Sequence, residues 1–242
     1  MPRDGDLSEG GPALIRLERL TKTFGEGDAA VGALRGIDVV IRDGEFVAIM
    51  GPSGSGKSTS MNILGCLDVP SAGRYLFRGV DVALLDGDQR ALLRRHYVGF
   101  VFQGYNLLPR TSALENVELP LIYRGFPSNE RRRLARDALA VVGLTGWERH
   151  YPNELSGGQQ QRVAIARAIV TEPAVLLADE PTGNLDTARS NEIMGLLTGL
   201  NRDKGITIIM VTHEPDMAAY AGRVIRFKDG LVESDEWARK AA

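Results

Sequence analysis

Residues 51–59 constrain this chain more than any other stretch of its sequence. The stretch matches the pattern G-x-x-x-x-G-K-[ST] and consists of Gly51, Pro52, Ser53, Gly54, Ser55, Gly56, Lys57, Ser58 and Thr59. The apolar run at 46–50 predicts a buried strand before it, and residues 61–64 predict the start of a helix after it. A Gly-rich turn between a strand and a helix directs backbone N–H groups and the helix dipole at one point. The stretch therefore predicts a phosphate-binding loop, the alternative being a Gly-rich turn without a ligand.

The residue types of this loop assign a role to each of its parts. The glycines let the backbone approach the phosphates, and Lys57 places a point charge between the β- and γ-phosphate. Ser58 offers a hydroxyl to Mg²⁺, and Thr59 reaches the side of the α-phosphate. We therefore expect the chain to bind a nucleoside triphosphate together with Mg²⁺.

Composition excludes several classes of protein. The length of 242 residues fits one large domain or two small ones, and the net charge of −2 gives no electrostatic case for a nucleic-acid partner. The single cysteine, Cys66, excludes an internal disulfide; we expect a small buried packing residue, a reactive thiol being the alternative. No stretch approaches the ~20 apolar residues of a membrane span, and residues 1–12 predict a polar, disordered leader. These features predict a cytosolic protein that meets a membrane only through a partner.

Apolar runs alternate with helical patterns along most of the chain. Residues 14–20, 37–41 and 75–77 predict strands of an antiparallel layer. The near-continuous apolar runs at 98–102, 175–178 and 206–211 are typical of parallel strands covered on both faces, and residues 224–232 predict a closing hairpin on an Asp-Gly turn. The pattern indicates an α/β fold.

Residues 104–166 predict a mostly helical insertion in this α/β core. Leu134, Ala138, Val141 and Val142 recur at helical spacing, with Gly143 as the expected C-cap. The arginine run at 131–133 predicts a solvated helix face, with an anion site as the alternative. The expected organisation is a leader at 1–12, a single domain at 13–235 and a tail at 236–242. Within that domain, segments 13–103 and 167–235 form the core and β layer around the helical insertion.

An acidic pair, Asp179 and Glu180, follows the apolar strand at 175–178. The carboxyl ends of parallel strands border the crevice in which α/β sheets bind ligands. Asp179 is therefore expected to hold Mg²⁺, through a water molecule, and Glu180 to act as general base on an attacking water. The alternative is two solvated carboxylates at a strand end.

A second Gly-rich turn leads into a predicted helix and consists of Ser156, Gly157, Gly158 and Gln159. It lacks a lysine, so it is not a complete second nucleotide site, but its backbone N–H groups predict anion binding. Two half-sites in one chain suggest that each completes the other across a two-fold dimer. A plain helix cap with Ser156 as N-cap is the alternative.

Four segments occur in an order that carries a family resemblance. They are GPSGSGKST at 51–59, LSGGQQQR at 155–162, LLADEP at 176–181, and His213 after ITIIMV at 206–211. Together they resemble the nucleotide-binding subunit of an ABC transporter, from Leu14 to Val232. The resemblance implies a RecA-like P-loop NTPase core with an antiparallel β layer and an α-helical subdomain. It also implies that the chain is an ATPase with ATP and Mg²⁺ as cofactors.

The resemblance extends to residues that the patterns alone do not assign. Phe24 matches the aromatic residue that stacks on adenine; that position is more often tyrosine, and a core residue at a strand end is the alternative. Gln103 matches the glutamine that contacts Mg²⁺ and water and links to the membrane partner. Asp186, in the loop 183–186, matches the segment that crosses the dimer, and His213 matches the switch histidine that holds the γ-phosphate, acting in catalysis with Lys57.

Further segments are similar to one bacterial group of ABC ATPases, those of macrolide efflux, antimicrobial-peptide export and lipoprotein release with their cell-division relative. These segments are LGCLD at 64–68, GFVFQ at 99–103, ENVELP at 115–120 and ADEPTGNLD at 178–186. The resemblance implies a homodimer that closes on ATP and drives a separate permease from the cytoplasmic face of the inner membrane. The permease would dock near Gln103, where Phe100, Leu107 and Leu108 either line a groove or pack in the core.

Three other functions are weighed against this one. A DNA-repair or chromosome-organising ATPase needs long coiled-coil arms, and the insertion lacks sustained heptads. A ribosome-binding relative carries two ATPase copies in one chain, whereas this sequence has one phosphate-binding loop. A divisome-type ATPase, which transmits force to a membrane partner without transporting a substrate, has the same sequence features and stays as the alternative.

Overall fold

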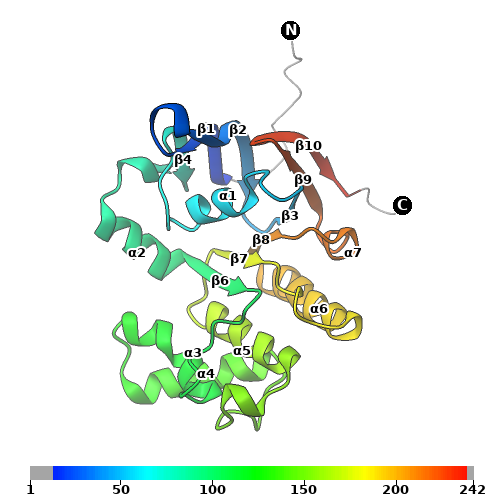
Figure 1. The fold of residues 1–242 in the computed structure, drawn as a ribbon. Coiled ribbons are helices and arrows are strands. Elements are labelled where there is room, and N and C mark those ends of the chain that lie inside the picture. Colours follow the sequence, from blue (N-terminus) through cyan, green and yellow to red (C-terminus); the bar gives the residue numbers. More distant parts are fainter. Residues whose placement is uncertain (1–12, 239–242) are drawn as a thin grey trace.

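The computed structural model describes residues 13–238 as three layers (Figure 1). A four-stranded antiparallel sheet, in the order β2-β1-β4-β5, forms one outer layer. Its strands are β1 (Ala13–Phe24), β2 (Val31–Arg42), β4 (Ala72–Phe77) and β5 (Val80–Asp81). The predicted antiparallel layer is confirmed, although β2 begins six residues before the predicted start at 37.

The middle layer is a six-stranded sheet in the order β10-β9-β3-β8-β7-β6. Its strands are β3 (Phe46–Met50), β6 (Val98–Phe102), β7 (Val175–Asp179), β8 (Thr207–Val211), β9 (Arg223–Lys228) and β10 (Leu231–Trp237). All neighbouring pairs are parallel except the hairpin of β9 and β10. The parallel sheet and the closing hairpin are therefore as predicted.

Helices cover both faces of the parallel sheet (Figure 1). They are α1 (Lys57–Leu64), α2 (Gly87–Tyr97), α3 (Ala113–Tyr123), α4 (Ser128–Val141), α5 (Gly157–Ile169), α6 (Thr187–Lys204) and α7 (Pro215–Ala218), with 3-10 turns at Gly27–Ala29, Val82–Leu84 and Pro152–Glu154. Helix α1 packs between the parallel sheet and the antiparallel layer, and α3, α4 and α5 build the third layer. The insertion is helical, as α3, α4 and the start of α5 show. Helix α5 continues through residue 166, because Ile169 still packs in the same apolar cluster.

The strands of the middle sheet divide their side chains between two cores. In β3, Val47 and Ile49 face the cluster shared with the antiparallel layer, whereas Ala48 and Met50 face the cluster shared with α3, α4 and α5. The same alternation occurs in β7 and β8. A strand buried on both faces must be apolar at every position, which explains the continuous apolar runs in the sequence.

Several smaller expectations also meet the structure. Cys66 is buried, and Gly143, just beyond α4, has a positive φ of 76°. In the arginine run, Arg131 and Arg132 approach the carboxylate of Glu118, at 3.5 Å and 4.0 Å, and so belong to an ion-pair network. Strand β10 extends to Trp237, and the predicted leader at 1–12 and the end of the tail lie outside the described residues.

Candidate functional site

The phosphate-loop sequence forms the turn between β3 and α1. Its first residue, Gly51, has a φ of 149°, and a Cβ there would collide with the carbonyl oxygen of Phe227. The residue at the N-cap of α1, Gly56, is left-handed at a φ of 102°, and no side chain caps this helix start. The first N–H groups of α1 are therefore available to an external anion.

Lys57, the first residue of α1, folds back over the loop. Its Nζ donates hydrogen bonds to the carbonyl oxygens of Gly51 at 2.7 Å and Pro52 at 2.8 Å. The ammonium group is thereby held at the loop, and its charge and the helix dipole together favour a phosphate there.

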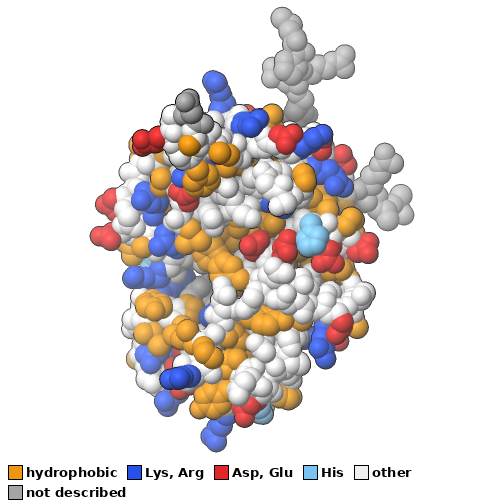
Figure 2. Space-filling view, viewed as in Figure 1, with side chains coloured by type: hydrophobic (Ala, Val, Ile, Leu, Met, Phe, Trp, Pro, Cys, Tyr) orange, Lys and Arg blue, Asp and Glu red, His pale blue; other side chains and the backbone are white. Residues whose placement is uncertain are grey.

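A cleft of about 650 Å³ brings most of the predicted residues together. It is lined by Phe24, Ala33, Gly51, Pro52, Ser53, Gly54, Gly56, Lys57, Ser58, Thr59, Asp179, Glu180, Val211 and His213. Phe24 exposes 47% of its surface at the end of β1, and Nζ of Lys22 lies over its ring, 5.0 Å from the centroid. Figure 2 shows acidic side chains beside a histidine across the middle of the face in view.

The acidic pair and the histidine meet because β7 and β8 are adjacent parallel strands. Asp179 pairs with Val211 across the sheet, and the N–H of Glu180 donates to the carbonyl oxygen of Val211 at 2.9 Å. The ring Nδ1 of His213 lies 2.9 Å from Oε1 of Glu180. Glu180 has a left-handed φ of 44°, a conformation that non-glycine residues adopt only under constraint and that is often found at functional sites.

Burial raises the pKa of the Asp179 carboxyl, the negative charge of Glu180 raises it further, and Lys57 opposes both. Two carboxylates close together favour a bound cation. The exposed Ser58 hydroxyl and the Asp179 carboxylate are hard oxygen ligands that suit Mg²⁺. Among residues 13–238 no group of three or more His, Cys, Asp or Glu could hold a metal, so Mg²⁺ here would need phosphate oxygens or water as further ligands.

Of the predicted residues outside this cleft, Ser55 is buried within the phosphate loop, and the others form a second group. Nε2 of Gln103 lies 3.5 Å from Oδ1 of Asn184, and a Cβ on Gly183 would be 2.6 Å from the same nitrogen. Gln103 therefore packs on the loop 183–186. Asp186 caps α6 by accepting the N–H of Arg189 at 2.9 Å.

The second Gly-rich turn, the signature turn at residues 156–159, belongs to this second group. Ser156 accepts the N–H of Gln159 with its hydroxyl at 3.3 Å, and Gln159 accepts the N–H of Ser156 with its side chain at 2.9 Å. A Cβ on Gly157 would lie 3.3 Å from the side chain of Leu185, next to Asp186. The signature turn and the loop 183–186 thus form one surface, separate from the first cleft.

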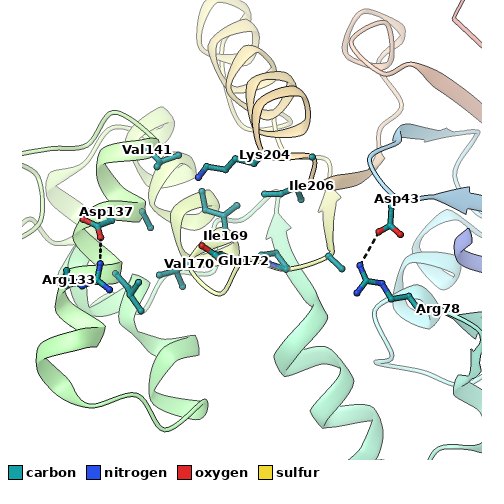
Figure 3. Close-up of a pocket in the computed structure, with 15 residues that line it drawn as sticks. Asp43, Arg78, Arg133, Asp137, Val141, Ile169, Val170, Glu172, Lys204 and Ile206 are labelled. Atoms are coloured by element: carbon teal, nitrogen blue, oxygen red, sulfur yellow. Dashed lines mark hydrogen bonds and ion pairs between the residues drawn. The ribbon is translucent and has the colours of Figure 1, made fainter. Parts of the chain in front are cut away.

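Two further cavities differ from the cleft in their charges. A cavity of about 700 Å³ lies at the opposite edge of the parallel sheet, where β7 and β8 begin. Four of its charged groups pair, Arg78 with Asp43 at 3.2 Å and Arg133 with Asp137 at 3.1 Å, and Glu172 and Lys204 line it as well (Figure 3). A groove of about 590 Å³ lies between α2, β6 and the helical layer. Phe100 and Phe102 line the groove with parallel rings 5.7 Å apart. Neither Leu107 nor Leu108 lines it, since Leu107 packs on the helical core and Leu108 is exposed.

Sequence reasoning missed three residues that the structure places around these surfaces. Ala33 lines the cleft because β2 begins at Val31, before the predicted start at 37. The residues around Ala33 do not alternate between apolar and polar, so the sequence does not indicate a strand there. Arg167 donates to the carbonyl oxygen of Tyr105, and the Tyr105 hydroxyl lies next to Gly157 of the second group; no sequence motif indicates either contact.

The ABC transporter family model matches residues 34–183, which is more than half of the chain. The chain belongs to the ABC transporter family. The cassette is 57% identical to the macrolide export ATP-binding/permease protein MacB of Marinobacter nauticus over 92% of this chain and 34% of that protein. It is 53% identical to the corresponding protein of Hyphomonas neptunium over 96% of this chain and 36% of that protein. It thus spans about a third of the length of these curated relatives.

Solved ABC cassettes share the fold. One is the ATP-binding cassette MJ0796, described as a dimer in a post-hydrolysis state bound to ADP and Pi, with a TM-score of 0.85 and 46% identity over 94% of this chain and all of that one. Another is cbiO1 from Clostridium perfringens, with a TM-score of 0.84 and 33% identity over 93% and 88% of the two chains. The predicted family and its P-loop NTPase fold are confirmed. No helix within residues 13–238 of the cassette is long and apolar enough to cross a membrane.

Proposed function

We propose that this cassette binds and hydrolyses ATP, with Mg²⁺, and that two copies close around two nucleotides. The observation that carries the proposal is the cleft in which the open start of α1, the acidic pair and His213 converge. A bound Mg²⁺, held from Ser58 and Asp179, would supply positive charge to the phosphates. The relatives support ATP as the nucleotide, since they are named ATP-binding proteins or described with ADP and Pi bound.

The chemistry follows from the positions of the side chains. Glu180 accepts a proton from a water that attacks the γ-phosphorus in line, and the bond to the bridging oxygen of ADP breaks. His213 orients the Glu180 carboxylate through its Nδ1, 2.9 Å away, and its Nε2 is available to the γ-phosphate. Lys57 neutralises charge that develops on the transferred phosphoryl group, and Phe24 stacks on adenine.

The second group of residues supports a dimer. Ser156, Gly157, Gly158, Gln159 and Asp186 lie outside the chain's own cleft and would meet the nucleotide of a second copy, with Gln103 carried beside them. A dimer is described for the MJ0796 cassette, which covers the same part of the fold.

The partner proposed for this dimer is a membrane permease with its cytoplasmic ends seated in the apolar groove of Phe100 and Phe102. The cassette would then work at the cytoplasmic face of the inner membrane. Because the relatives are named macrolide export proteins, substrate export is favoured over force transmission without transport.

Replacing Glu180 tests the catalytic part. Glu180→Gln should keep nucleotide binding and lower turnover by roughly 10²–10⁴-fold, the usual worth of a general base. ATPase assays and equilibrium nucleotide binding measure the two effects separately. Glu214→Gln, a carboxylate that does not line the cleft, is the matched control and should keep turnover. Near-parental turnover of Glu180→Gln would remove Glu180 from the role.

The same variant tests the dimer. With ATP bound and hydrolysis blocked, Glu180→Gln should sediment as a dimer, because the closed state no longer decays. Sedimentation as a monomer at high protein concentration would contradict the shared site.

A further inference from the structure

Two consecutive residues after β6 have an unusual backbone. Tyr105 and Asn106 are both left-handed, with φ values of 58° and 49°. Non-glycine residues rarely adopt this conformation, and it costs a tyrosine more than an asparagine. Such strain persists only where surrounding groups impose it.

Arg167, on α5, is the group that holds this pair. Its Nη2 donates to the carbonyl oxygen of Tyr105 at 2.9 Å and its Nη1 to that of Asn106 at 2.6 Å. The side chain is half-buried, and desolvation lowers the pKa of its guanidinium. A planar guanidinium can grip two successive carbonyl oxygens, which a lysine ammonium cannot do with the same geometry.

The segment 103–106, which contains the strained pair, touches both loops of the proposed dimer surface. A Cβ on Gly157, in the signature turn, would lie 2.8 Å from the hydroxyl oxygen of Tyr105. Two residues before Tyr105, the carbonyl oxygen of Gln103 accepts a hydrogen bond from Nδ2 of Asn184 at 2.9 Å. Segment 103–106 therefore bridges the signature turn and the loop 183–186.

The same pair also borders the groove proposed for the permease. Asn106 and Arg167 line that groove together with Phe100 and Phe102. Because Arg167 and Gly157 lie on one helix, α5 joins the groove to the signature turn rigidly.

We propose that Arg167 is a positioning residue: by holding Tyr105 and Asn106 left-handed, it aligns the signature turn with the loop 183–186 for closure onto the second copy. The proposal rests on the ATP-closed dimer proposed above. Arg167 does not line the chain's own nucleotide cleft, so its loss acts on dimerisation and not on the affinity of a single copy for ATP.

The test measures ATP-driven dimerisation by sedimentation in the Glu180→Gln background. Arg167→Met should raise the protein concentration needed for half-dimerisation by about tenfold or more, while single-chain ATP affinity stays within about twofold. Adding Asn106→Gly should recover much of the loss, because glycine adopts the left-handed backbone at little cost. Arg167→Lys, which keeps the charge without the fork, is a milder second variant if the methionine variant fails to fold.

A matched control lies on the same helix. Arg162 donates to the carbonyl oxygen of Val142 at 2.8 Å and pairs with Glu192, so Arg162→Met also removes a carbonyl-binding arginine from α5. It should leave dimerisation unchanged. If Arg167→Met dimerises as well as its parent, the positioning role alone is overturned. The same holds if Asn106→Gly does not restore dimerisation and Arg162→Met lowers it as much as Arg167→Met does. Failure of the Glu180→Gln parent to dimerise overturns the proposed dimer itself.

Discussion

Two helices of this protein begin at glycine-rich turns, and they begin differently. At α1 the N-cap is the left-handed Gly56, no side chain caps the helix, and Lys57 holds its ammonium over the loop. At α5 the N-cap is Ser156, and a reciprocal capping box with Gln159 satisfies N–H groups from within the chain. The first start is open to an anion, whereas the second is partly satisfied by its own side chains, which leave the N–H groups of Gly157 and Gly158 unused.

This difference limits what each turn can do alone. The turn at α1 combines free N–H groups, a lysine and neighbouring carboxylates, which are the groups that the proposed nucleotide and its cation would need. The turn at α5 contains no lysine; the donors it can offer an anion are the N–H groups of Gly157 and Gly158 and the Ser156 hydroxyl, which accepts the Gln159 N–H and can still donate its own proton. Without a lysine of its own, this turn fits the proposed site shared with a second copy, and not a separate nucleotide site.

The largest effect is expected from replacing a glycine of the first turn, which should lower nucleotide affinity. In Gly51→Ala the added Cβ meets the carbonyl oxygen of Phe227, a backbone atom that cannot move aside, at a φ that L residues rarely adopt. Nucleotide affinity should fall by on the order of 100-fold, equivalent to about 2.8 kcal/mol. Isothermal titration with ATP measures it.

The corresponding change in the second turn should behave otherwise. In Gly158→Ala the nearest atom is the flexible side chain of Arg189 at 3.4 Å, so the single chain should bind ATP as before. Equal losses of ATP affinity in the two alanine variants would show that both turns serve the chain's own nucleotide, and the contrast between them would be wrong.

A mixed dimer gives the next largest effect. Ser156→Arg in one copy removes the hydroxyl and places a bulky charge in the turn, so hydrolysis at the other copy's site should fall by about 10²-fold, the scale of losing one positioned donor. The copy that carries Ser156→Arg also carries Glu180→Gln, which silences that copy's own site. The control dimer carries Glu180→Gln in one copy and no change at Ser156, so both dimers report turnover at the other copy's site alone. Unchanged turnover at the remaining site would contradict sharing across the interface.

Sequence patterns predicted most of the fold because the middle sheet is buried on both faces. Residues 46–50, 175–178 and 206–211 have no polar face to vary, so each strand is visible as an apolar run. The first half of β2 escaped prediction, since Val31 to Gly36 contains two glycines, an arginine and no alternation. Its place is set by pairing with β1, which is a contact distant in sequence.

The two turns were predicted unequally for a similar reason. The pattern at 51–59 carries its chemistry in adjacent residues, so its role is local. At the second turn the sequence predicted anion binding, with Ser156 as a plain N-cap the alternative; the structure shows Ser156 as N-cap in a capping box with Gln159, and the sequence did not indicate Tyr105 or Arg167. Those roles depend on positive φ angles and on contacts between distant segments, which composition and spacing do not encode.

The smallest expected effect comes from the carboxylate beside the first turn. The pKa of Asp179 is raised in the folded protein, first by burial and then by Glu180, so the folded state holds that proton more tightly than the unfolded state. The resulting stability is fully present below the ordinary value of 3.8 and is lost as pH rises through the raised pKa. Ionised Asp179 therefore destabilises the cassette without nucleotide at neutral pH. Asp179→Asn should raise its Tm by roughly 1–3 °C at pH 7 and leave it nearly unchanged near pH 4, as thermal unfolding would show.

Adding ATP with Mg²⁺ should reverse the order of the two melting temperatures, so that the parent melts above Asp179→Asn. The parent would gain stability from the bound cation in proportion to its occupancy, whereas Asp179→Asn would lose that gain together with the ligand oxygen. If the asparagine variant melts below its parent without nucleotide across this pH range, the carboxylate stabilises the empty cleft. In that case the uncompensated charge beside the first turn would not destabilise the empty cassette, and in this respect the first turn would not differ from the second.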